Sequence, residues 1–265
     1  MSESRKLDQF YTKRSVAEYC YKILSKKFYL NNYLLLEPSA GSGSFSNLFH
    51  ENSIAYDLDP KIPSIKKQDF LLLDTEELSQ RNVFVIGNPP FGKNSSLAIK
   101  FFNKSADFAN YIAFILPKTF KKESVINKLN DYFHLIDEID LPENSFVFND
   151  EDYDVPCVFQ IWVKKSIKRD KVVSRRESKL FKFVKKDDAD FAIRRVGGLA
   201  GKVIEDFKDY KEPSHYYIKV NEKEISKRQL INKIVSIYPE LQRLAKYSAG
   251  NPSLSKGELI RELEK

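Results

Sequence analysis

The segment VFVIGNPPFG at residues 83–92 places an amide, two prolines and an aromatic ring directly after an apolar run. Each proline fixes φ and lacks an N–H, so the turn is rigid and nearby carbonyl groups stay free to accept hydrogen bonds. Asn88 adds a side-chain carbonyl, and Phe91 adds a flat apolar ring. These groups suit an exocyclic amine on a planar ring, because two acceptors can take its two N–H protons while the phenyl ring stacks. A merely rigid turn is the structural alternative.

A second turn with chemical potential, LLLEPSAGSGSF at residues 34–45, also follows an apolar run. Gly41 and Gly43 lack a Cβ, so the backbone here can pass close to a ligand, and a helix start after the turn would offer free amides. Glu37 ends the apolar run. Asp57 follows sixteen residues after Gly41 and could accept both hydroxyl protons of a ribose. An ordinary strand-to-helix turn, with a turn aspartate after it, is the alternative for this pair.

Both turns require strands that bring them to one edge of a sheet. Apolar runs and helical spacing predict the following elements: strands at 33–36, 53–57, 82–87, 111–117, 134–141 and 155–163, and helices at 16–27, 45–51, 95–107 and 121–133. Ser15 and Glu18 predict a capping box at the first helix. Strands alternating with helices indicate a mainly parallel α/β sheet, with active residues at the carboxyl ends of its strands.

Taken together and in this order, the motifs resemble those of the gamma-type S-adenosylmethionine-dependent amino-methyltransferases. The similar segments are DQFYTKRSVAEYC (8–20), EPSAGSGSF (37–45), YDLDP (56–60), QDFLL (68–72), GNPPFG (87–92), LPKTF (116–120) and DVPCVFQIW (154–162). The resemblance covers about residues 8–164. It implies a class I methyltransferase fold, a Rossmann-like seven-stranded sheet with helices on both faces. It also implies S-adenosylmethionine as cofactor and methyl transfer to the N6 amine of adenine in nucleic acid, with DNA slightly favoured over RNA.

The resemblance implies a role for individual residues. Asn88 and the Pro89 carbonyl would accept the target amine, Pro90 belongs to the same rigid turn, and Phe91 would stack on the target base. Phe146 or Phe148 would pack on the opposite side of that base. The implied cofactor contacts are Phe10, Tyr11 and Thr12 at the methionine end, Glu37, Ala40 and Gly41 along the middle, Asp57 at the ribose, and Leu58, Asp69 and Phe70 around the adenine, with Asn88 beside them. No strong general base is needed, because placement and electrostatic preorganisation supply most of the acceleration.

Positive charge is concentrated in one part of the chain. The net charge is +7, and residues 164–202 hold fourteen Lys and Arg against five Asp and Glu. Such a block is typical of a nucleic-acid binder, and a solvated Lys-rich face is the alternative. The predicted substrate contacts in this block are Arg175, Arg176, Arg194, Arg195 and Lys202. The glycine cluster at 194–202 does not match a phosphate-binding loop, because Val196 and Val203 stand where Gly and Ser or Thr are required.

The change of pattern near residue 164 predicts two regions. Residues 1–164 would form the catalytic domain. Residues 165–265 would form a smaller basic region for substrate binding, with a few strands and then helices, the last near 256–264 behind a capping box of Ser255 and Glu258. This region is short for recognising a DNA site. Either sequence specificity is modest, or a protein partner supplies it, or the substrate is structured RNA.

Composition excludes several classes of protein. Two cysteines cannot form a disulfide framework, and three histidines offer little for a zinc site, so no metal is expected. No apolar run reaches the ~20 residues of a membrane span, and the polar start lacks a signal-peptide stretch. We therefore expect a cytoplasmic or nuclear protein that does not enter a membrane. The functional alternatives are a protein-glutamine or cytosine-N4 methyltransferase, or a catalytically idle methyltransferase-like subunit that binds nucleic acid or scaffolds a partner.

Overall fold

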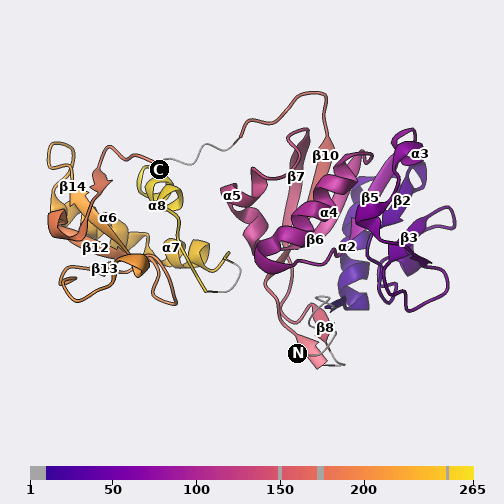
Figure 1. The fold of residues 1–265 in the computed structure, drawn as a ribbon, viewed down its shortest axis with the longest axis horizontal. Helices are drawn as coiled ribbons and strands as arrows, with labels where there is room; N and C mark the ends of the chain where they lie inside the picture. The colour runs from indigo at the N-terminus through magenta and orange to yellow at the C-terminus, as the bar shows by residue number, and fades with distance from the viewer. Residues whose placement is uncertain (1–9, 149–150, 172–175, 249–250) are drawn as a thin grey trace. The chain divides into compact units, whose positions relative to one another are not determined.

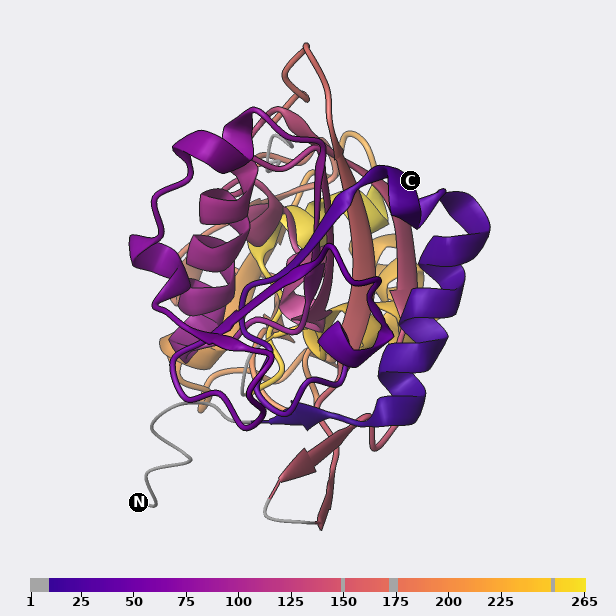
Figure 2. The same ribbon diagram turned by 90° about the vertical axis from the view of Figure 1, so that its right-hand side faces the viewer.

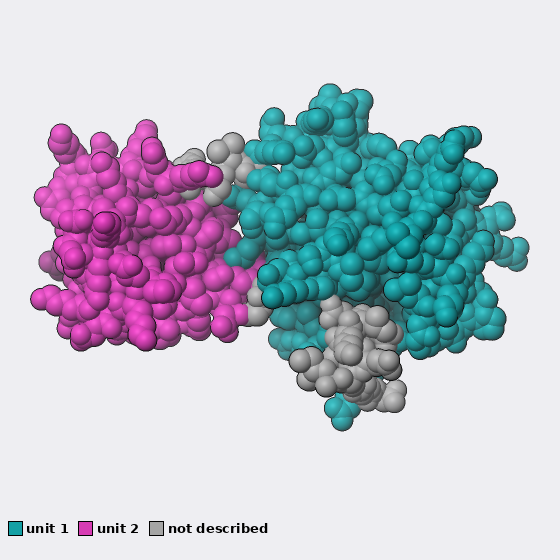
Figure 3. All heavy atoms as spheres, viewed as in Figure 1, with its two compact units in different colours: residues 1–171 teal, residues 172–265 magenta. Residues whose placement is uncertain are grey.

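A computed structural model describes residues 10–148, 151–171, 176–248 and 251–265. The chain divides into two compact units, Met1–Lys171 and Val172–Lys265 (Figure 3). The division falls after the predicted boundary at 164 because the intervening segment is bonded to unit 1. The Lys165 amide donates to the Tyr132 carbonyl (2.8 Å), and Arg169 Nη2 donates to the carbonyls of Ile126 (2.5 Å) and Leu129 (2.9 Å).

A seven-stranded sheet forms the centre of unit 1 (Figure 1). Its strands are β2 (Leu34–Glu37), β3 (Ile54–Asp57), β4 (Lys66–Lys67), β5 (Val83–Gly87), β6 (Tyr111–Pro117), β7 (Phe133–Asp140) and β10 (Cys157–Lys164). The strand order is β4-β3-β2-β5-β6-β10-β7, and β10 alone runs antiparallel to its neighbours. The chain turns from one side of β2 to the other between β4 and β5. The predicted Rossmann-like α/β sheet is therefore confirmed, with its topological switch point between β2 and β5.

Helices cover both faces of this sheet, with α2 (Arg14–Lys27) on one face and α4 (Ser96–Ala106) on the other (Figure 2). Successive residues of a strand point to opposite faces. Leu35 accordingly packs in the cluster that contains α2, whereas Leu36 packs in the cluster that contains α4. Burial on both faces explains why the strands are nearly continuous apolar runs in the sequence.

Two predicted helices are much shorter than expected. Residues 46–48 form a single 3₁₀ turn, because the Ser46 amide donates to the Glu37 carboxylate (2.8 Å) instead of a helical carbonyl. The predicted helix at 121–133 is reduced to α5 (Glu123–Ile126), and α3 (Glu76–Ser79) is equally short. After α5, the amide side chain of Asn103 bonds both the Lys128 carbonyl (3.0 Å) and the Asn130 amide (2.8 Å). These tertiary bonds replace the helical ones.

The predicted capping box of Ser15 and Glu18 is wrong. Helix α2 begins at Arg14, and Lys13 occupies the N-cap position without a side-chain cap. Glu18 instead accepts a hydrogen bond from Arg14 Nε (2.8 Å) one turn earlier. The residue types suggested a box because Ser and Glu have the right spacing, but the helix starts two residues too early for Ser15 to cap it.

A small sheet that the sequence did not predict joins the start of unit 1 to a distant hairpin. Its strands are β1 (Tyr11–Thr12), β8 (Phe146–Phe148) and β9 (Glu151–Tyr153), all antiparallel. The Lys13 amide donates to the Ser145 carbonyl (3.1 Å), and Lys13 Nζ pairs with Asp152 (2.6 Å). The hairpin thereby holds β1 beside the switch point.

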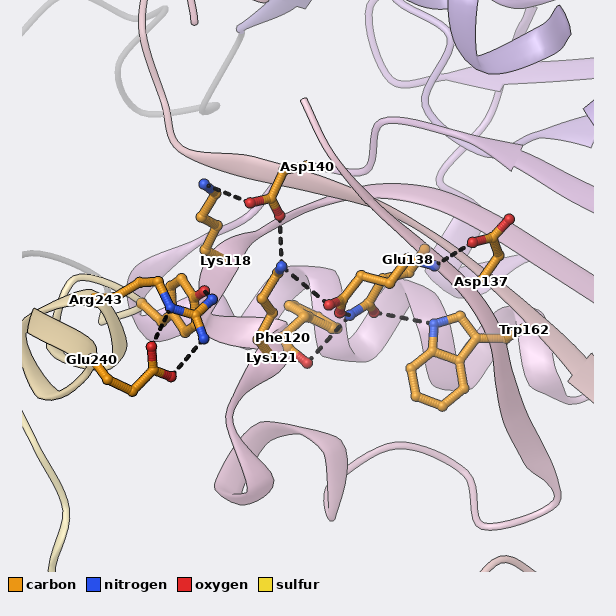
Figure 4. Close-up of polar contacts among 11 residues, drawn as sticks. Lys118, Phe120, Lys121, Asp137, Glu138, Asp140, Trp162, Glu240 and Arg243 are labelled. Atoms are coloured by element: carbon orange, nitrogen blue, oxygen red, sulfur yellow. Dashed lines mark hydrogen bonds and ion pairs between the residues drawn. The ribbon is translucent and has the colours of Figure 1, made fainter. Parts of the chain in front are cut away.

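The loop after β6 is fixed by a polar network on β7 and β10 (Figure 4). Trp162 Nε1 donates to Gln160 Oε1 (3.1 Å), and Gln160 Nε2 donates to Glu138 Oε2 (2.7 Å). Lys121 Nζ then bridges Glu138 (3.1 Å) and Asp140 (2.6 Å). Because Lys121 belongs to the loop and its partners belong to the sheet, the network anchors the loop to the sheet edge.

Unit 2 is an antiparallel sheet covered by helices. Its strands, in the order β11-β14-β12-β13, are β11 (Phe181–Phe183), β14 (His215–Val220), β12 (Phe191–Arg194) and β13 (Val203–Ile204), and its helices are α6 (Lys227–Ser236), α7 (Tyr238–Ala245) and α8 (Lys256–Leu263). Ile193, Tyr216 and Ile218 share a buried cluster with leucines of the helices. The predicted strands, last helix and Ser255–Glu258 capping box are confirmed. Among the described residues, every helix is too short or too polar to cross a membrane.

Candidate active site

A pocket lies at the carboxyl ends of β2 and β5, where the strand order reverses. Its empty volume is about 920 Å³, including space open to solvent. The pocket is lined by all the residues predicted for catalysis and cofactor binding: Phe10, Tyr11, Thr12, Glu37, Ala40, Gly41, Asp57, Leu58, Asp69, Phe70, Asn88, Pro89, Pro90 and Phe91. Ligands bind at such a switch point in open α/β sheets, since the loops of neighbouring strands part there. Residues from five separate segments thus share one cavity.

The amide of Asn88 has one satisfied end and one unsatisfied end. Its Nδ2 donates to the carbonyl of Phe10 (3.2 Å), which fixes the orientation of the amide. Its Oδ1 is buried and has no hydrogen-bond partner among the described residues. Ser39 Oγ also donates to the main-chain carbonyl of Asn88 (3.1 Å). A buried acceptor without a donor is unfavourable, so this oxygen is prepared for an N–H group that comes from outside the protein.

Phe91 is held at the pocket wall by its own backbone. Its carbonyl accepts the amides of Leu97 (3.1 Å) and Ala98 (3.2 Å) at the first turn of α4. The intervening turn is strained, because Asn94 and Ser95 both have left-handed backbones with φ of 54° and 61°. Ser95 Oγ lies 2.7 Å from Thr119 Oγ1 in the loop after β6. Strain of this kind persists only where the surroundings enforce it, and it clusters at functional sites.

The glycine turn is shaped by both Tyr11 and Asp57. Gly41 has a φ of +50°, and a Cβ there would lie 2.7 Å from the Tyr11 ring. Asp57 Oδ2 accepts the Gly41 amide (2.7 Å), while Oδ1 accepts the Asp59 amide (2.7 Å). Asp57 therefore organises the turn as well as lining the pocket. Only glycine satisfies both the conformation and the close approach at position 41.

Glu37 is a buried carboxyl group with an unusual pKa. Its side chain is 2% exposed, and Oε2 accepts the Ser46 amide (2.8 Å). Burial raises its pKa to about 8, hydrogen bonds from Ser46 oppose the rise, and the negative charge of Asp57 adds to it. At neutral pH Glu37 is therefore largely protonated, and a cationic ligand group placed beside it would favour the charged form.

Leu58, Asp69 and Phe70 add two apolar side chains and an acid to the lining of the pocket. Leu58 is 55% exposed although it is a leucine, and it borders the cavity. Phe70 is buried and stacks on Phe101, with ring centroids 5.3 Å apart and an interplanar angle of 27°. Asp69 Oδ1 accepts the Leu71 amide (2.9 Å). Such a slot suits a flat heteroaromatic ring with a polar edge.

The two aromatic residues predicted for the far side of a target base do not border the pocket. Phe146 is fully buried and stands perpendicular to Phe91, with centroids 6.5 Å apart, so it supports Phe91 from below. Phe148 packs on Phe10 (5.5 Å) and Tyr153 (5.8 Å). Phe146 therefore cannot face a base opposite Phe91, whereas the half-buried Phe148 lies behind Phe10 at the rim of the pocket lining.

Sequence reasoning missed seven residues that line the pocket: Pro38, Ser39, Ser42, Ser44, Asp59, Gln68 and Phe101. Ser39 and Ser44 were passed over as turn residues, and Phe101 as a helix residue of the core. Ser44 Oγ donates to the Thr12 carbonyl (2.7 Å) and so ties the glycine turn to β1. Their position inside EPSAGSGSF was the available signal for the serines, whereas Phe101 depends on how α4 packs.

The predicted substrate contacts in unit 2 do not form one group. Arg175 lies outside the described residues, and Arg176 is exposed. Arg195 turns toward the helix-covered face, with its guanidinium carbon 5.2 Å from the Tyr216 ring centroid. Arg194 and Lys202 remain on the other face of the sheet. Within the described residues, no group of three or more His, Cys, Asp or Glu side chains could hold a metal ion.

Comparison with known proteins gives likeness of fold only. No protein-family model matches the chain, and no curated protein matches it. It is similar to a modification subunit assigned to a type I restriction enzyme of Vibrio vulnificus YJ016, with 17% identity over 59% of this chain and 44% of that one, and a TM-score of 0.45. It is also similar to a Pyrococcus horikoshii protein assigned as an RNA methyltransferase, with 15% identity over 62% of this chain and 90% of that one, and a TM-score of 0.46. A third similar structure is the 23S rRNA methyltransferase ErmE, with 13% identity over 60% of this chain and 71% of that one, and a TM-score of 0.40. The chain spans less than half the length of the Vibrio subunit.

The strand order defines the class of fold independently of these likenesses. Six parallel strands, with the reversed strand β10 inserted next to the last position, form the sheet of class I methyltransferases. The pocket lies at the switch point of that sheet. The chain therefore has a class I methyltransferase fold with a preformed pocket at its switch point.

Proposed function

We propose that this chain transfers a methyl group from S-adenosylmethionine to the exocyclic N6 amine of adenine in nucleic acid. The observation that carries the proposal is the buried Asn88 Oδ1, which has no partner among the described residues and lies in a rigid turn at the switch-point pocket. It is supported by Phe91 at the pocket wall and by the two prolines between them. DNA is slightly favoured over RNA as the substrate.

The pocket fits S-adenosylmethionine in chemistry as well as position. Glu37 would lie along the middle of the cofactor, where the positive charge of the sulfonium compensates the cost of ionising a buried carboxyl group. Asp57 would hold the ribose hydroxyls, and Leu58 with Asp69 would flank the adenine. Phe10 and the two residues of β1, Tyr11 and Thr12, would close the methionine end. When bound, S-adenosylmethionine supplies an electrophilic methyl group carried on a positively charged sulfur.

The catalytic turn would bind the target amine by its protons. Asn88 Oδ1 would accept one N–H and the Pro89 carbonyl the other, which favours a pyramidal nitrogen with a localised lone pair. Phe91 would hold the ring in place by stacking. Because the acceptors are fixed before the substrate arrives, they require no reorganisation during the reaction. In a duplex the base must first leave the stack, whereas in a single strand it is already accessible.

Transfer of a labelled methyl group tests the proposal directly. The chain is incubated with labelled S-adenosylmethionine and, in parallel, with single-stranded and duplex DNA, RNA and protein, and each product is digested to nucleosides or amino acids. We expect label in N6-methyladenine. Label confined to N4-methylcytosine or methylglutamine would overturn the adenine assignment, and cofactor binding without any transfer would indicate an idle subunit.

A protein-glutamine substrate is the second candidate, because its side-chain amide presents the same planar NH₂ group. One observation favours it: the exposed Glu151 of β9 places negative charge on the hairpin that packs on Phe10, whereas the neighbouring Asp152 is paired with Lys13. That charge would repel phosphates and attract a basic peptide. The basic residues of unit 2 favour nucleic acid instead. A partner protein that supplies specificity is compatible with either substrate.

A further inference from the structure

Three basic side chains form a row across the sheet of unit 2. Arg194 on β12 is directly opposite His215 on β14, and its amide donates to the carbonyl of Lys202 (2.9 Å), the residue just before β13. Ile193 and Val203, the neighbours of Arg194 and Lys202, are paired and lie on the helix-covered side. By the alternation of a strand, Arg194 and Lys202 therefore share the opposite face.

This row lacks the acids that normally accompany such residues. Like charges on adjacent strands of one face destabilise a sheet. Among the described residues no carboxylate forms an ion pair with Arg194 or Lys202, whereas Lys219 and Lys227 in the same unit pair with Asp190 (2.7 Å) and Glu205 (3.6 Å). The third member, His215, is buried, and its Nδ1 bonds the Lys211 carbonyl (2.9 Å). An external anion would relieve the repulsion between the arginine and the lysine.

A glycine turn beside the row offers further donors. The guanidinium of Arg194 is folded against it, since Nε donates to the Val196 carbonyl (3.1 Å) and Nη2 lies 3.7 Å from where a Cβ of Gly197 would be. Within the described part of the chain, the amides of Gly198 and Leu199 donate to no main-chain carbonyl. Successive free amides of this kind in a turn form an anion-binding concavity.

No contact within unit 2 explains why residue 198 is a glycine. A Cβ there would meet nothing within 4 Å, and the backbone is not in the left-handed region. Packing and conformation would therefore both accept alanine. Glycine at such an exposed position is consistent with the close approach of a ligand to the backbone.

We infer that Arg194, Lys202 and the turn of Gly198 and Leu199 form a phosphate-binding site for the sugar–phosphate backbone of a nucleic acid. Arg195 is not part of it, because its side chain lies on the other face against Tyr216. The inference rests on the proposed nucleic-acid substrate. The inference narrows the predicted nucleic-acid contacts from the basic residues of 164–202 to one site on one face of unit 2.

The salt dependence of binding tests the site on the full chain. A fluorescent single-stranded oligonucleotide of mixed sequence is titrated at several salt concentrations. Each engaged cation contributes about 0.7 to the slope of log affinity against log salt on a single strand, so Arg194→Gln with Lys202→Gln should lower the slope by about 1.4. Affinity at low salt should fall at least about tenfold in the same variant. The matched control, Lys223→Gln with Arg228→Gln, removes one exposed Lys and one exposed Arg from the same unit and should leave the slope unchanged.

Two further variants protect the test against misfolding. Lys202→Gln alone changes an exposed side chain and should remove about half of the slope difference. Gly198→Ala should weaken binding several-fold while leaving the unfolding temperature unchanged or slightly raised, since it only restricts the unfolded chain. Equal loss of slope in the double variant and its control, or no loss in either, would overturn the site.

The test of this phosphate site can be distinguished from the test of the proposed methyl transfer. Binding of S-adenosylmethionine, measured by calorimetry, should be the same in the double variant and the unaltered chain, because these residues lie outside the pocket. If the chain binds the oligonucleotide with the expected slopes but never methylates it, the site stands and the adenine reaction falls. If methylation proceeds while the double variant retains the full slope, the reaction stands and the site falls.

Discussion

The two sheets of this chain expose their polar groups in opposite ways. In unit 1 the strands run mainly parallel and are covered on both faces, so polar side chains gather where the strands end, at Glu37, Asp57 and Asn88. In unit 2 the strands are antiparallel and the helices pack on one face, while the half-exposed Arg194 lies on the other face, beside the buried His215. The first arrangement concentrates a few groups in a pocket. The second spreads them over a surface.

This difference predicts the kind of ligand that each unit can bind. Buried, preorganised acceptors such as Asn88 Oδ1 recognise one small chemical group and tolerate little change. Exposed cations act through charge, and their contributions are spread over many weak contacts and are screened by salt. Substitutions in unit 1 should therefore be severe and specific, whereas those in unit 2 should be graded and dependent on conditions. The following predictions test that contrast.

Asn88→Ala should have the largest effect. It removes the unpaired acceptor, so turnover should fall by about a hundredfold or more, as for the loss of one preorganised group. Affinity for S-adenosylmethionine, measured by calorimetry, should stay near that of the unaltered chain. Initial rates with labelled cofactor give the comparison. Turnover that survives the substitution would show that the amine is bound elsewhere.

Asp57→Ala should reduce cofactor affinity. The carboxylate holds the amides of Gly41 (2.7 Å) and Asp59 (2.7 Å) and is the proposed ribose acceptor. Loss of charge-assisted bonds costs roughly 1.5–3 kcal/mol each, which is about a tenfold to hundredfold loss of affinity for one bond. Calorimetric titration measures it. An unchanged affinity for S-adenosylmethionine would show that Asp57 only organises the turn and does not bind the ribose.

Glu37→Gln should change how stability depends on pH. Burial raises the pKa of Glu37 from 4.5 to about 8, so the folded state binds a proton that the unfolded state releases in this range. Its contribution to stability is fully present below about pH 4.5 and is lost as pH rises toward 8. Urea unfolding without ligand, at a series of pH values, should show this loss in the unaltered chain and not in Glu37→Gln. If the free energy of unfolding depends on pH in the same way in both proteins, Glu37 is not a buried, protonated carboxyl group in the folded state.

Ser39→Ala should have a moderate effect on turnover. The lost hydrogen bond to the Asn88 carbonyl (3.1 Å) contributes about 0.5–1.5 kcal/mol, or about a twofold to tenfold slower reaction. The effect should appear in kcat and not in the KM for the cofactor. Ser79→Ala is the matched control, because Ser79 also donates its hydroxyl to a main-chain carbonyl (2.6 Å) but lies on α3. Equal effects of both substitutions would argue against a positioning role.

Ser255→Ala should have the smallest effect and should be confined to unit 2. It removes the side-chain cap of α8, at a cost of about 1 kcal/mol in the stability of that unit. Cofactor affinity should not change. Calorimetric unfolding together with a cofactor titration would show both results, and a loss of cofactor binding would mean that the two units are more interdependent than the contrast implies.

The sequence predicted the sheet and the pocket lining because those features are encoded locally. The apolar runs at 34–37 and 83–87 and the turns that follow them specify both the strands and what stands at their ends. The predicted helices are shorter where side chains distant in the sequence bind the backbone groups that a helix would use. Glu37 accepts the Ser46 amide, and Asn103 binds the backbone after α5 in place of helical hydrogen bonds.

Other features depend on pairs far apart in the chain. The sheet of β1 with β8 joins residues more than a hundred positions apart, and two-residue strands such as β1 have no periodicity to read. Phe146 was chosen as an aromatic residue in the right loop, and only packing shows that it is buried beneath Phe91. In unit 2 the charge count was visible, but strand alternation decides that Arg194 and Arg195 face opposite ways.

The bond between Asn88 Nδ2 and the Phe10 carbonyl has a consequence for the whole pocket. Both residues of strand β1 and the preceding Phe10 line the pocket, and the Phe10 carbonyl fixes which end of the Asn88 amide faces the cavity. Any event that seats β1 therefore also readies the amine site, and Ser44 fastens the same strand to the glycine turn (2.7 Å). Under the proposed function, a substitution that loosens β1 should therefore impair the cofactor end and the amine acceptor of the pocket together.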